Sequence, residues 1–392
     1  MAKLNAILEI GTSKIVCLID RPGEGASTSI PSTALVRFDG IRNGRWSNYP
    51  GLAEDLLEAI SRAESQIGKK VKSCAVGVPG CFSRILFREG KRKINGMVQK
   101  EDIDWLINRL RPEMNEGFDL IDVQPAYFMD DRDNVYLNEP LRLKTSTLRC
   151  GVTYFYGFRP FLDDIERALF AGHIVVERFI CEPLAQALYF IPRQERDKTA
   201  ALIDIGYYGT GISLVYGDTI LSHVNLELGG STVTNRLINR LGLKESLAEN
   251  LKRRHIFGIE VSAGEKVYAK DEAGRMVEFE APLIKGSIDE IADIICTEVR
   301  RELHRHRNYL RKDAKIYLIG AGIAMQGFDS YMKRKISGNL VLPSKSKYRS
   351  LPPIYNSAVA LLDNNLAKVY HLRSDRIGTK IKDKVNRFLN MK

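Results

Sequence analysis

Two widely separated segments of the chain share one pattern: an apolar strand, a glycine-containing turn and a second apolar strand. The first runs from Ala6 to Ile19 around the turn Gly11 to Lys14, and the second runs from Ala200 to Tyr216 around Gly206 to Gly211. Apolar runs joined by a short glycine turn indicate β-hairpins. Further strands and helices follow each hairpin, which favours a duplicated α/β architecture with a cleft between its halves. A single α/β domain with incidental glycine turns stays open on this spacing alone.

The composition is that of a globular chain with excess positive charge. The 392 residues are 44% apolar, and 59 basic against 48 acidic residues give a formal charge of +11. The length suggests two or three folding units, and the charge favours anionic partners. Six cysteines without a C-x-x-C pair indicate reduced, cytoplasmic thiols. The segment Met1 to Lys14 is not typical of a signal peptide, and no apolar run reaches the roughly 20 residues that span a bilayer. We therefore expect a soluble or peripheral protein.

Both glycine turns carry groups suited to phosphate. Backbone N–H groups of such turns can surround phosphate oxygens, and a carboxylate at a strand end can hold a hydrated Mg²⁺. A third glycine turn follows the strand Lys315 to Ile319 and allows close backbone approach by a flat base. No G-x-x-x-x-G-K-[ST] segment is present, which excludes a P-loop. The candidates are Glu9, Gly11, Thr12, Ser13 and Lys14 in the first turn, Asp204, Gly206, Gly209 and Thr210 in the second, and Gly320, Ala321 and Gly322 in the third.

Six segments in a fixed order resemble those of the actin-like ATPases, and among them the FtsA family. Val123 to Lys144 is similar to part of the subdomain inserted in FtsA. The resemblance implies an α/β, two-lobed actin-like fold, shared by actin, Hsp70 and hexokinase, with an FtsA-type inserted subdomain. The six segments are Leu8 to Lys14, Cys181 to Ala187, Ile203 to Thr210, Leu228 to Asn235, Ala248 to Arg254 and Leu318 to Gly327.

The resemblance also implies subdomain boundaries. They are 1–85, 160–198 and 352–370 for subdomain 1A, 86–159 for the inserted subdomain, 199–227 and 313–351 for subdomain 2A, 228–312 for subdomain 2B, and 371–392 for a linker and a membrane-targeting helix.

ATP and Mg²⁺ are the cleft ligands that the resemblance implies. The two hairpin turns correspond to the phosphate loops, and the third turn corresponds to the adenosine turn. For Glu249, an exposed helical charge stays open as an alternative. The remaining implied contacts are Gly229, Gly230, Glu249 and Lys252 at the ribose and base, and Glu9 and Asp204 at the metal.

Three departures from the family pattern bear on catalysis. Glu9 stands where the family has an aspartate, and its extra methylene moves the carboxylate relative to the metal. The second turn reads G-Y-Y-G-T, so Tyr207 and Tyr208 add bulk where phosphate loops favour glycine. Arg236 replaces a usual aspartate. We expect ATP binding with weak or absent hydrolysis, and no catalytic base is assigned.

The C-terminal segment 376–392 has an apolar face and a basic face. Helical spacing of its apolar residues is typical of a helix lying in the headgroup plane, with lysines reaching anionic phosphates. A helix docked on its own domain stays open. The segment follows a polar stretch, Asp363 to Asp375, that we expect to be a linker. The membrane candidates are Ile377, Ile381, Lys382, Lys384, Val385, Arg387, Phe388 and Leu389.

Glu298 to Lys312 is strongly basic and is expected to be helical. It has no nucleic-acid recognition motif, and a solvated face stays open as the simpler interpretation. FtsA relatives bind the acidic C-terminal peptide of FtsZ on the corresponding small subdomain. The resemblance therefore implies peptide contacts from Arg300, Arg301, Arg305 and Arg307.

These features together predict a cell-division scaffold. It would bind ATP with Mg²⁺, self-associate, attach to an anionic membrane at the cytoplasmic face of the inner membrane, and recruit FtsZ and later divisome proteins at the septum. No nucleic acid partner is expected. Two alternatives remain: a PilM-like pilus-assembly adaptor, and an actin-fold ATPase or kinase.

Overall fold

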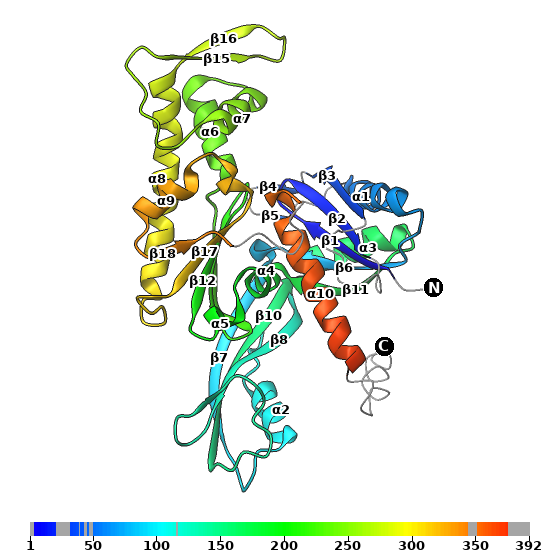
Figure 1. Ribbon diagram of the computed structural model, residues 1–392. Coiled ribbons are helices and arrows are strands. Elements are labelled where there is room, and N and C mark those ends of the chain that lie inside the picture. Colours follow the sequence, from blue (N-terminus) through cyan, green and yellow to red (C-terminus); the bar gives the residue numbers. More distant parts are fainter. Residues whose placement is uncertain are drawn as a thin grey trace.

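The chain folds into two lobes with a third sheet projecting below them (Figure 1). The computed structural model describes residues 4–20, 32–38, 40–42, 45–46, 50–114, 117–343 and 351–374.

The first lobe is built on a five-stranded sheet. In sheet order its strands are β11 (Val175–Cys181), β6 (Ser73–Val78), β1 (Asn5–Ile10), β2 (Lys14–Asp20) and β3 (Ser32–Arg37). β1, β2 and β3 are antiparallel neighbours, whereas β6 and β11 run parallel to β1. Every residue of β1 is buried, as expected for a strand covered on both faces. The outer face packs on α1 (Leu52–Ile67) and α3 (Arg159–Ala171).

The second lobe repeats this arrangement. In sheet order its strands are β14 (Thr219–Leu226), β13 (Thr210–Tyr216), β12 (Ala200–Ile205), β17 (Lys315–Ile319) and β18 (Asn339–Val341). β12, β13 and β14 are antiparallel neighbours, and β17 and β18 run parallel to β12. Both sheets thus consist of a three-stranded meander followed by two parallel strands. This shared topology confirms the two predicted hairpins and the duplicated, actin-like fold.

Two helices fill the space between the sheets. They are α4 (Glu182–Phe190) and α10 (Asn356–Ser374), and they bury apolar residues from both lobes in one continuous core. The predicted linker Asp363 to Asp375 is wrong up to Ser374, because α10 continues through it. Asn365 is buried there and accepts a hydrogen bond from Arg178 Nε at 2.9 Å, which ties this polar stretch to β11. The membrane candidates in 376–392 lie outside the described residues.

The inserted subdomain is a separate four-stranded sheet. Its elements are β7 (Ser83–Lys93), α2 (Lys100–Arg109), β8 (Phe118–Met129), β9 (Val135–Tyr136) and β10 (Thr147–Phe158). The sheet order is β7-β10-β8-β9, and α2 packs against it to close a small core. Thr153 Oγ1 donates to Ile220 O of β14 at 2.8 Å, so the insertion also contacts the second lobe.

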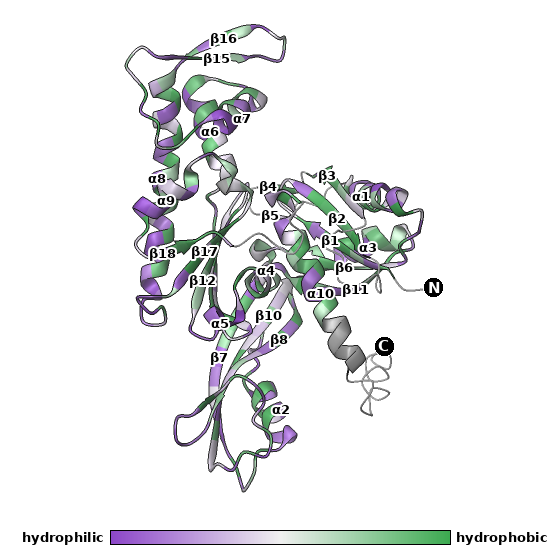
Figure 2. Ribbon diagram, in the orientation of Figure 1, coloured by the Kyte–Doolittle hydropathy of each residue, from purple (hydrophilic) through white to green (hydrophobic). Residues whose placement is uncertain are grey.

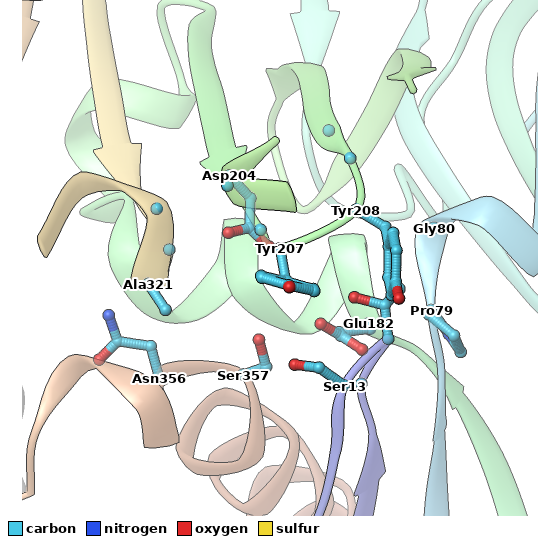
Figure 3. A pocket seen from close by; sticks show the side chains of 18 of the residues that line it. Ser13, Pro79, Gly80, Glu182, Asp204, Tyr207, Tyr208, Ala321, Asn356 and Ser357 are labelled. Carbon is cyan, nitrogen blue, oxygen red and sulfur yellow. The ribbon is translucent and has the colours of Figure 1, made fainter. Parts of the chain in front are cut away.

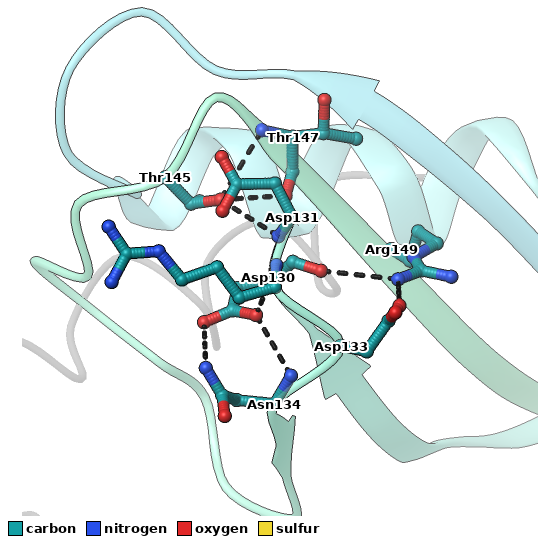
Figure 4. Close-up of polar contacts among 8 residues, drawn as sticks. Asp130, Asp131, Asp133, Asn134, Thr145, Thr147 and Arg149 are labelled. Carbon is teal, nitrogen blue, oxygen red and sulfur yellow. Dashed lines mark hydrogen bonds and ion pairs between the residues drawn. The ribbon is translucent and has the colours of Figure 1, made fainter.

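The turn between β8 and β9 is held by side chains (Figure 4). Asp130 accepts hydrogen bonds from the backbone N–H groups of Arg132 and Asn134, each at 2.9 Å, and Asp131 accepts from Ser146. Arg149 pairs with Asp133. The acidic groups therefore serve the turn itself.

The upper part of the second lobe is helical and carries a β-ribbon. Its elements are α6 (Gly230–Leu241), α7 (Glu245–Arg254), β15 (Lys266–Lys270), β16 (Met276–Glu280), α8 (Ala281–Arg305) and α9 (Phe328–Lys335). The expected helix Glu298 to Lys312 is wrong in extent, since α8 begins at Ala281 and ends at Arg305. Buried Ile284, Ile288 and Ile295 recur at helical spacing and extend the helix backwards.

Short elements complete the chain. They are β4 (Ile41–Arg42), β5 (Arg45–Trp46), α5 (Arg193–Arg196) and the 3₁₀ turns η1 (Gly80–Phe82), η2 (Ala321–Ala324) and η3 (Pro353–Tyr355). Figure 2 shows apolar residues along the central strands of the first lobe and hydrophilic ones on outward-facing helices such as α7 and α9. Among the described residues, no helix is both long and apolar enough to cross a membrane.

Candidate functional site

A cleft of about 860 Å³ lies between the lobes and is lined from both of them (Figure 3). Its walls include all three glycine turns. Thr210 and Gly229 do not line it, because Thr210 is fully buried with Oγ1 donating to Leu228 O at 2.6 Å, and Gly229 packs on the second turn. The candidates that do line it are Glu9, Gly11, Thr12, Ser13, Lys14, Asp204, Gly206, Gly209, Gly230, Glu249, Lys252, Gly320, Ala321 and Gly322.

The first turn, between β1 and β2, is organised by a buried ion pair. Gly11 N–H donates to Lys14 O at 2.9 Å and closes the turn. Lys14 Nζ lies 2.7 Å from Glu9 Oε2, and both side chains are largely shielded from solvent. A Cβ on Gly11 would lie 2.7 Å from Glu9 Oε1, so glycine is needed for this carboxylate position. Thr12 and Ser13 at the tip face the cleft.

Three carboxylates meet on the cleft floor: Glu9 from β1, Asp204 from β12 and Glu182 from the start of α4. Burial, together with the charges of Glu9 and Asp204, raises the pKa of Glu182 to about 8. Burial also raises the pKa of Asp204. Gln186 Nε2 joins the group, donating to Asp204 Oδ2 at 2.8 Å and to Glu182 Oε1 at 3.1 Å. Glu182 is therefore protonated over much of the neutral range.

The second turn, between β12 and β13, is pinned to helix α6 by its backbone. Gly206 N–H donates to Gly209 O at 2.8 Å, while Gly206 O and Tyr207 O accept from Gly230 N at 3.0 Å and Ser231 N at 2.7 Å. A Cβ on Gly229 would lie 2.5 Å from Tyr207 O, so only glycine allows this approach. Tyr207 and Tyr208 project from the turn into the cleft (Figure 3).

Glu249 and Lys252 on α7 are paired with each other. Lys252 Nζ lies 2.5 Å from Glu249 Oε2 and also donates to Gly230 O and Thr234 Oγ1. Lys252 is only 6% exposed, and burial lowers its pKa. The exposed-charge alternative for Glu249 is therefore wrong, since the carboxylate is tied to Lys252 and Thr234.

The third turn packs against the second. Gly320 has a φ of 102°, and a Cβ there would lie 2.3 Å from Ile205 O. A Cβ on Gly322 would lie 2.5 Å from Ile205 Cγ2. These glycines are thus required by backbone packing between β12 and β17 as well as by any ligand.

Several cleft residues were not singled out from the sequence. The start of α10 contributes Asn356 and Ser357, and Gln186 Nε2 donates to Ser357 Oγ at 2.9 Å. β14 contributes His223, whose pKa burial lowers to about 4 and whose Nε2 packs against Gly80 from the other lobe. No local motif marks these residues, although a Pro-Pro pair just before a helix at 352–353 signals a turn.

Other candidates lie away from the cleft. Arg236 forms an exposed ion pair with Glu290. Of the four arginines proposed for peptide binding, Arg300, Arg301 and Arg305 are exposed at the end of α8, far from the ribbon (Figure 1), and Arg307 is exposed just after this helix. Arg301 and Arg305 pair with Glu298 and Glu302. In the described part of the chain, no group of three or more His, Cys, Asp or Glu side chains is arranged to hold a metal ion.

The repeated sheets, the interlobe cleft and the inserted sheet define a two-lobed protein of the actin-like class. Solved structures agree. The chain superimposes on a protein of the PilM–PilN type IV pilus biogenesis complex with a TM-score of 0.64 at 18% identity, covering 93% of this chain and 98% of that one. It matches MreB5 of Spiroplasma citri, solved with AMPPNP, with a TM-score of 0.54 at 10% identity, over 95% and 99% of the chains. These identities establish the fold and nothing finer.

Within that class the chain is a divergent relative of the FtsA cell division proteins. It is 23% identical to FtsA of Bacillus subtilis over 372 residues, which is 92% of this chain and 83% of that protein. It is 24% identical to FtsA of Neisseria meningitidis over 309 residues, covering 76% and 73% of the two chains. No family model matches the sequence.

Proposed function

We propose that this chain is an actin-like scaffold of bacterial cell division that binds ATP with Mg²⁺ in the interlobe cleft. The observation that carries the proposal is the cleft itself, lined by turns of both lobes in a chain that resembles FtsA along most of its length. The scaffold self-associates, attaches to the cytoplasmic face of the membrane at the septum, and binds the FtsZ C-terminal peptide and later divisome proteins.

The chemistry of the cleft fits a magnesium nucleotide. Lys14 and the tip of the first turn suit phosphate oxygens, and Asp204, which accepts a hydrogen bond from the neutral amide of Gln186, suits a hydrated cation. Glu182 Oε2 is buried without a hydrogen-bond partner in the described part of the chain. Glu9 and Asp204 would hold the waters of a hydrated Mg²⁺, which neutralises phosphate charge when bound.

Hydrolysis is expected to be slow. A general base must be deprotonated at the working pH, and the pKa of Glu182, about 8, keeps this carboxyl group mostly protonated near neutrality. Glu9 is engaged by Lys14, and Asp204 by Gln186. The nucleotide then acts mainly as a ligand that joins the lobes.

Membrane attachment by the segment 376–392 explains why self-association matters. Basic residues near an anionic surface contribute roughly 1 kcal/mol each, and a short amphipathic helix must also be ordered on binding. One such helix is a marginal anchor. A filament linking many of them gains roughly 10² to 10⁴ in avidity without new contacts.

Thermal denaturation with Mg-ATP tests the nucleotide. Ligand at 100 times its Kd stabilises the fold by about 2.7 kcal/mol, so the Tm should rise by several degrees with Mg-ATP and with ADP. An unchanged Tm with both nucleotides would contradict the proposal. Phosphorylation of an added sugar would instead support the kinase alternative.

Cosedimentation with anionic vesicles tests the membrane step. We expect the full chain to sediment and a chain lacking 376–392 to stay in solution. Phe388→Ser keeps every positive charge and removes one apolar residue of the segment, so it should weaken sedimentation partially. Undiminished sedimentation of the shortened chain would favour the PilM-like alternative.

The FtsZ peptide gives a third test. Peptide binding should fall when Arg300 and Arg307 are both replaced by glutamate, because an acidic peptide is attracted by exposed arginines. Lys69→Glu combined with Lys100→Glu, at two exposed lysines elsewhere, is the matched charge change. Equal binding by both variants would remove these arginines from the peptide site.

A further inference from the structure

The ring of Tyr207 covers the one lysine that α7 contributes to the described cleft wall. Lys252 Nζ lies 5.2 Å from the ring centroid, a cation–π distance. In Figure 3 the ring lies in the middle of the cleft, between Ala321 of the third turn and Ser13 of the first. The ring therefore lies inside the cleft between the third turn and the first.

Beneath the ring, Lys252 has no donor left for a ligand. A lysine ammonium has three N–H donors, and three oxygens surround this one: Gly230 O at 3.1 Å, Thr234 Oγ1 at 3.0 Å and Glu249 Oε2 at 2.5 Å. The other oxygen of Glu249 accepts from Arg253 Nε at 3.0 Å. The pair is complete without a nucleotide, and the ring closes the remaining side.

The backbone and the side chain of Tyr207 are fixed to different degrees. Its carbonyl accepts from Ser231 N at 2.7 Å, which pins the backbone to α6. The side chain is half-buried, its hydroxyl donates to Glu245 Oε1 at 3.1 Å, and its ring meets Tyr208 edge-on at 4.9 Å. A half-buried ring held by one hydrogen bond, one edge contact and the contact with Lys252 can rotate about its side-chain torsions while the turn stays in place.

We propose that Tyr207 is a gate that limits how tightly the cleft binds a nucleotide. A nucleotide that spans the third and first turns binds only when the ring has rotated off Lys252, so the apparent affinity is lower than that of the open form by the fraction of molecules that are open. This inference rests on the proposed nucleotide site. It makes Tyr207 a residue that sets the affinity of the cleft, a role that a glycine at the same position cannot play.

Calorimetric titration of the full chain with Mg-ATP tests the gate. Tyr207→Ala should lower the Kd at least fivefold, because the path is then permanently open. Tyr309→Ala is the control: it removes an exposed ring that does not line the cleft, and should change the Kd by less than twofold. Tyr207→Phe loses the bond to Glu245 but keeps the ring, and should lower the Kd by about twofold. Equal or weaker binding by Tyr207→Ala than by Tyr309→Ala overturns the gate.

A second measurement does not depend on nucleotide. Amine-reactive labelling without ligand, read by mass spectrometry, should modify Lys252 several-fold faster in Tyr207→Ala than in Tyr309→Ala. The exposed Lys244 serves as the internal standard. Unchanged labelling of Lys252 overturns the cover itself. Faster labelling with no nucleotide binding by any variant, the wild type included, overturns both the nucleotide site and the gate, whereas tight binding by all with no gain in Tyr207→Ala overturns the gate alone.

Discussion

The two hairpin turns occupy equivalent places in the two sheets but are held by different means. The first turn is stabilised by side chains, because Lys14 and Glu9 form a largely buried ion pair. The second turn is stabilised by its backbone, because the carbonyls of Gly206 and Tyr207 accept hydrogen bonds from the first residues of α6. Two copies of one sheet topology can thus stabilise the equivalent turn by different means.

The difference extends to charge. The carboxylate of Glu9 in the first lobe pairs with a cation, Lys14, whereas Asp204 of the second lobe accepts a hydrogen bond from the neutral amide of Gln186. Glu182 limits the negative charge at the cleft floor by staying protonated near neutral pH, since its pKa rises to about 8. The floor of the cleft is thus asymmetric: the first lobe suits phosphate and the second suits a cation.

Removing the cation of the first turn should give the largest effect. Lys14→Met leaves Glu9 buried without its partner, and breaking a buried pair from one side costs about 3 kcal/mol or more. Urea unfolding should show a loss of about 3 kcal/mol in stability, together with a smaller shift in Tm by Mg-ATP. Lys100→Met, which breaks an exposed pair with Glu139, should cost about 0.5 kcal/mol. Equal losses in the two variants would show that the first turn does not depend on its ion pair.

The second-largest loss of stability should come from a methyl group placed between α6 and the second turn. In Gly229→Ala the new Cβ meets backbone atoms, Tyr207 O at 2.5 Å and Gly206 O at 2.8 Å, which cannot rotate away. Overpacking of this kind costs about 1–3 kcal/mol, and we expect about 2 kcal/mol by urea unfolding. Gly286→Ala in the exposed middle of α8 meets nothing within 4 Å and should gain about 0.5–1 kcal/mol. A neutral Gly229→Ala would contradict the backbone bracing of this turn.

The charge balance between the turns predicts a pH dependence. The folded chain keeps a proton on Glu182 up to about pH 8, whereas the unfolded chain releases it near 4.5. The wild type therefore loses stability as the pH rises from about 4.5 to about 8. Glu182→Gln should remove this loss, so the variant should be more stable than the wild type by about 2 kcal/mol at pH 8. The gain is smaller than a single isolated carboxyl group would give, because Glu9 and Asp204 share the titration. Unfolding curves from pH 4.5 to 9 check it, and a constant difference between the two chains would contradict the pKa shift.

Local patterns predicted the hairpins but not the long strands of the insertion. β1 with β2 and β12 with β13 are joined by short turns, so their pairing follows from neighbouring residues. β8 and β10 are each 12 residues long, yet the longest continuous apolar run in β8 is the four residues Ala126 to Met129, and Pro125 interrupts the pattern just before it. The two strands pair across the 17 residues between Met129 and Thr147, a separation at which sequence periodicity gives no register.

The sequence predicted the turns that line the cleft but not the side-chain contacts inside it. Glycine and hydroxyl residues after apolar strands identified most of its walls. The position of Tyr207 over Lys252 was not accessible, because it depends on how α7 is placed against the second turn. The saturation of Lys252 by Glu249, Thr234 and Gly230 has the same origin: α6 and α7 must pack before these groups meet.

The smallest effect should come from Arg236, a departure from the family pattern that lies outside the cleft. Arg236 pairs with Glu290 at 2.5 Å, with both side chains more than a third exposed, and such pairs contribute about 0.5 kcal/mol. Arg236→Ala should lower stability by about that amount and leave the Tm shift by Mg-ATP unchanged. Arg240→Ala, which removes a 3.6 Å contact to the same glutamate, should change stability less still. A lost Mg-ATP shift in Arg236→Ala alone would place α6 itself in nucleotide binding, and the contrast between a side-chain-held and a backbone-held turn would then have to include this helix.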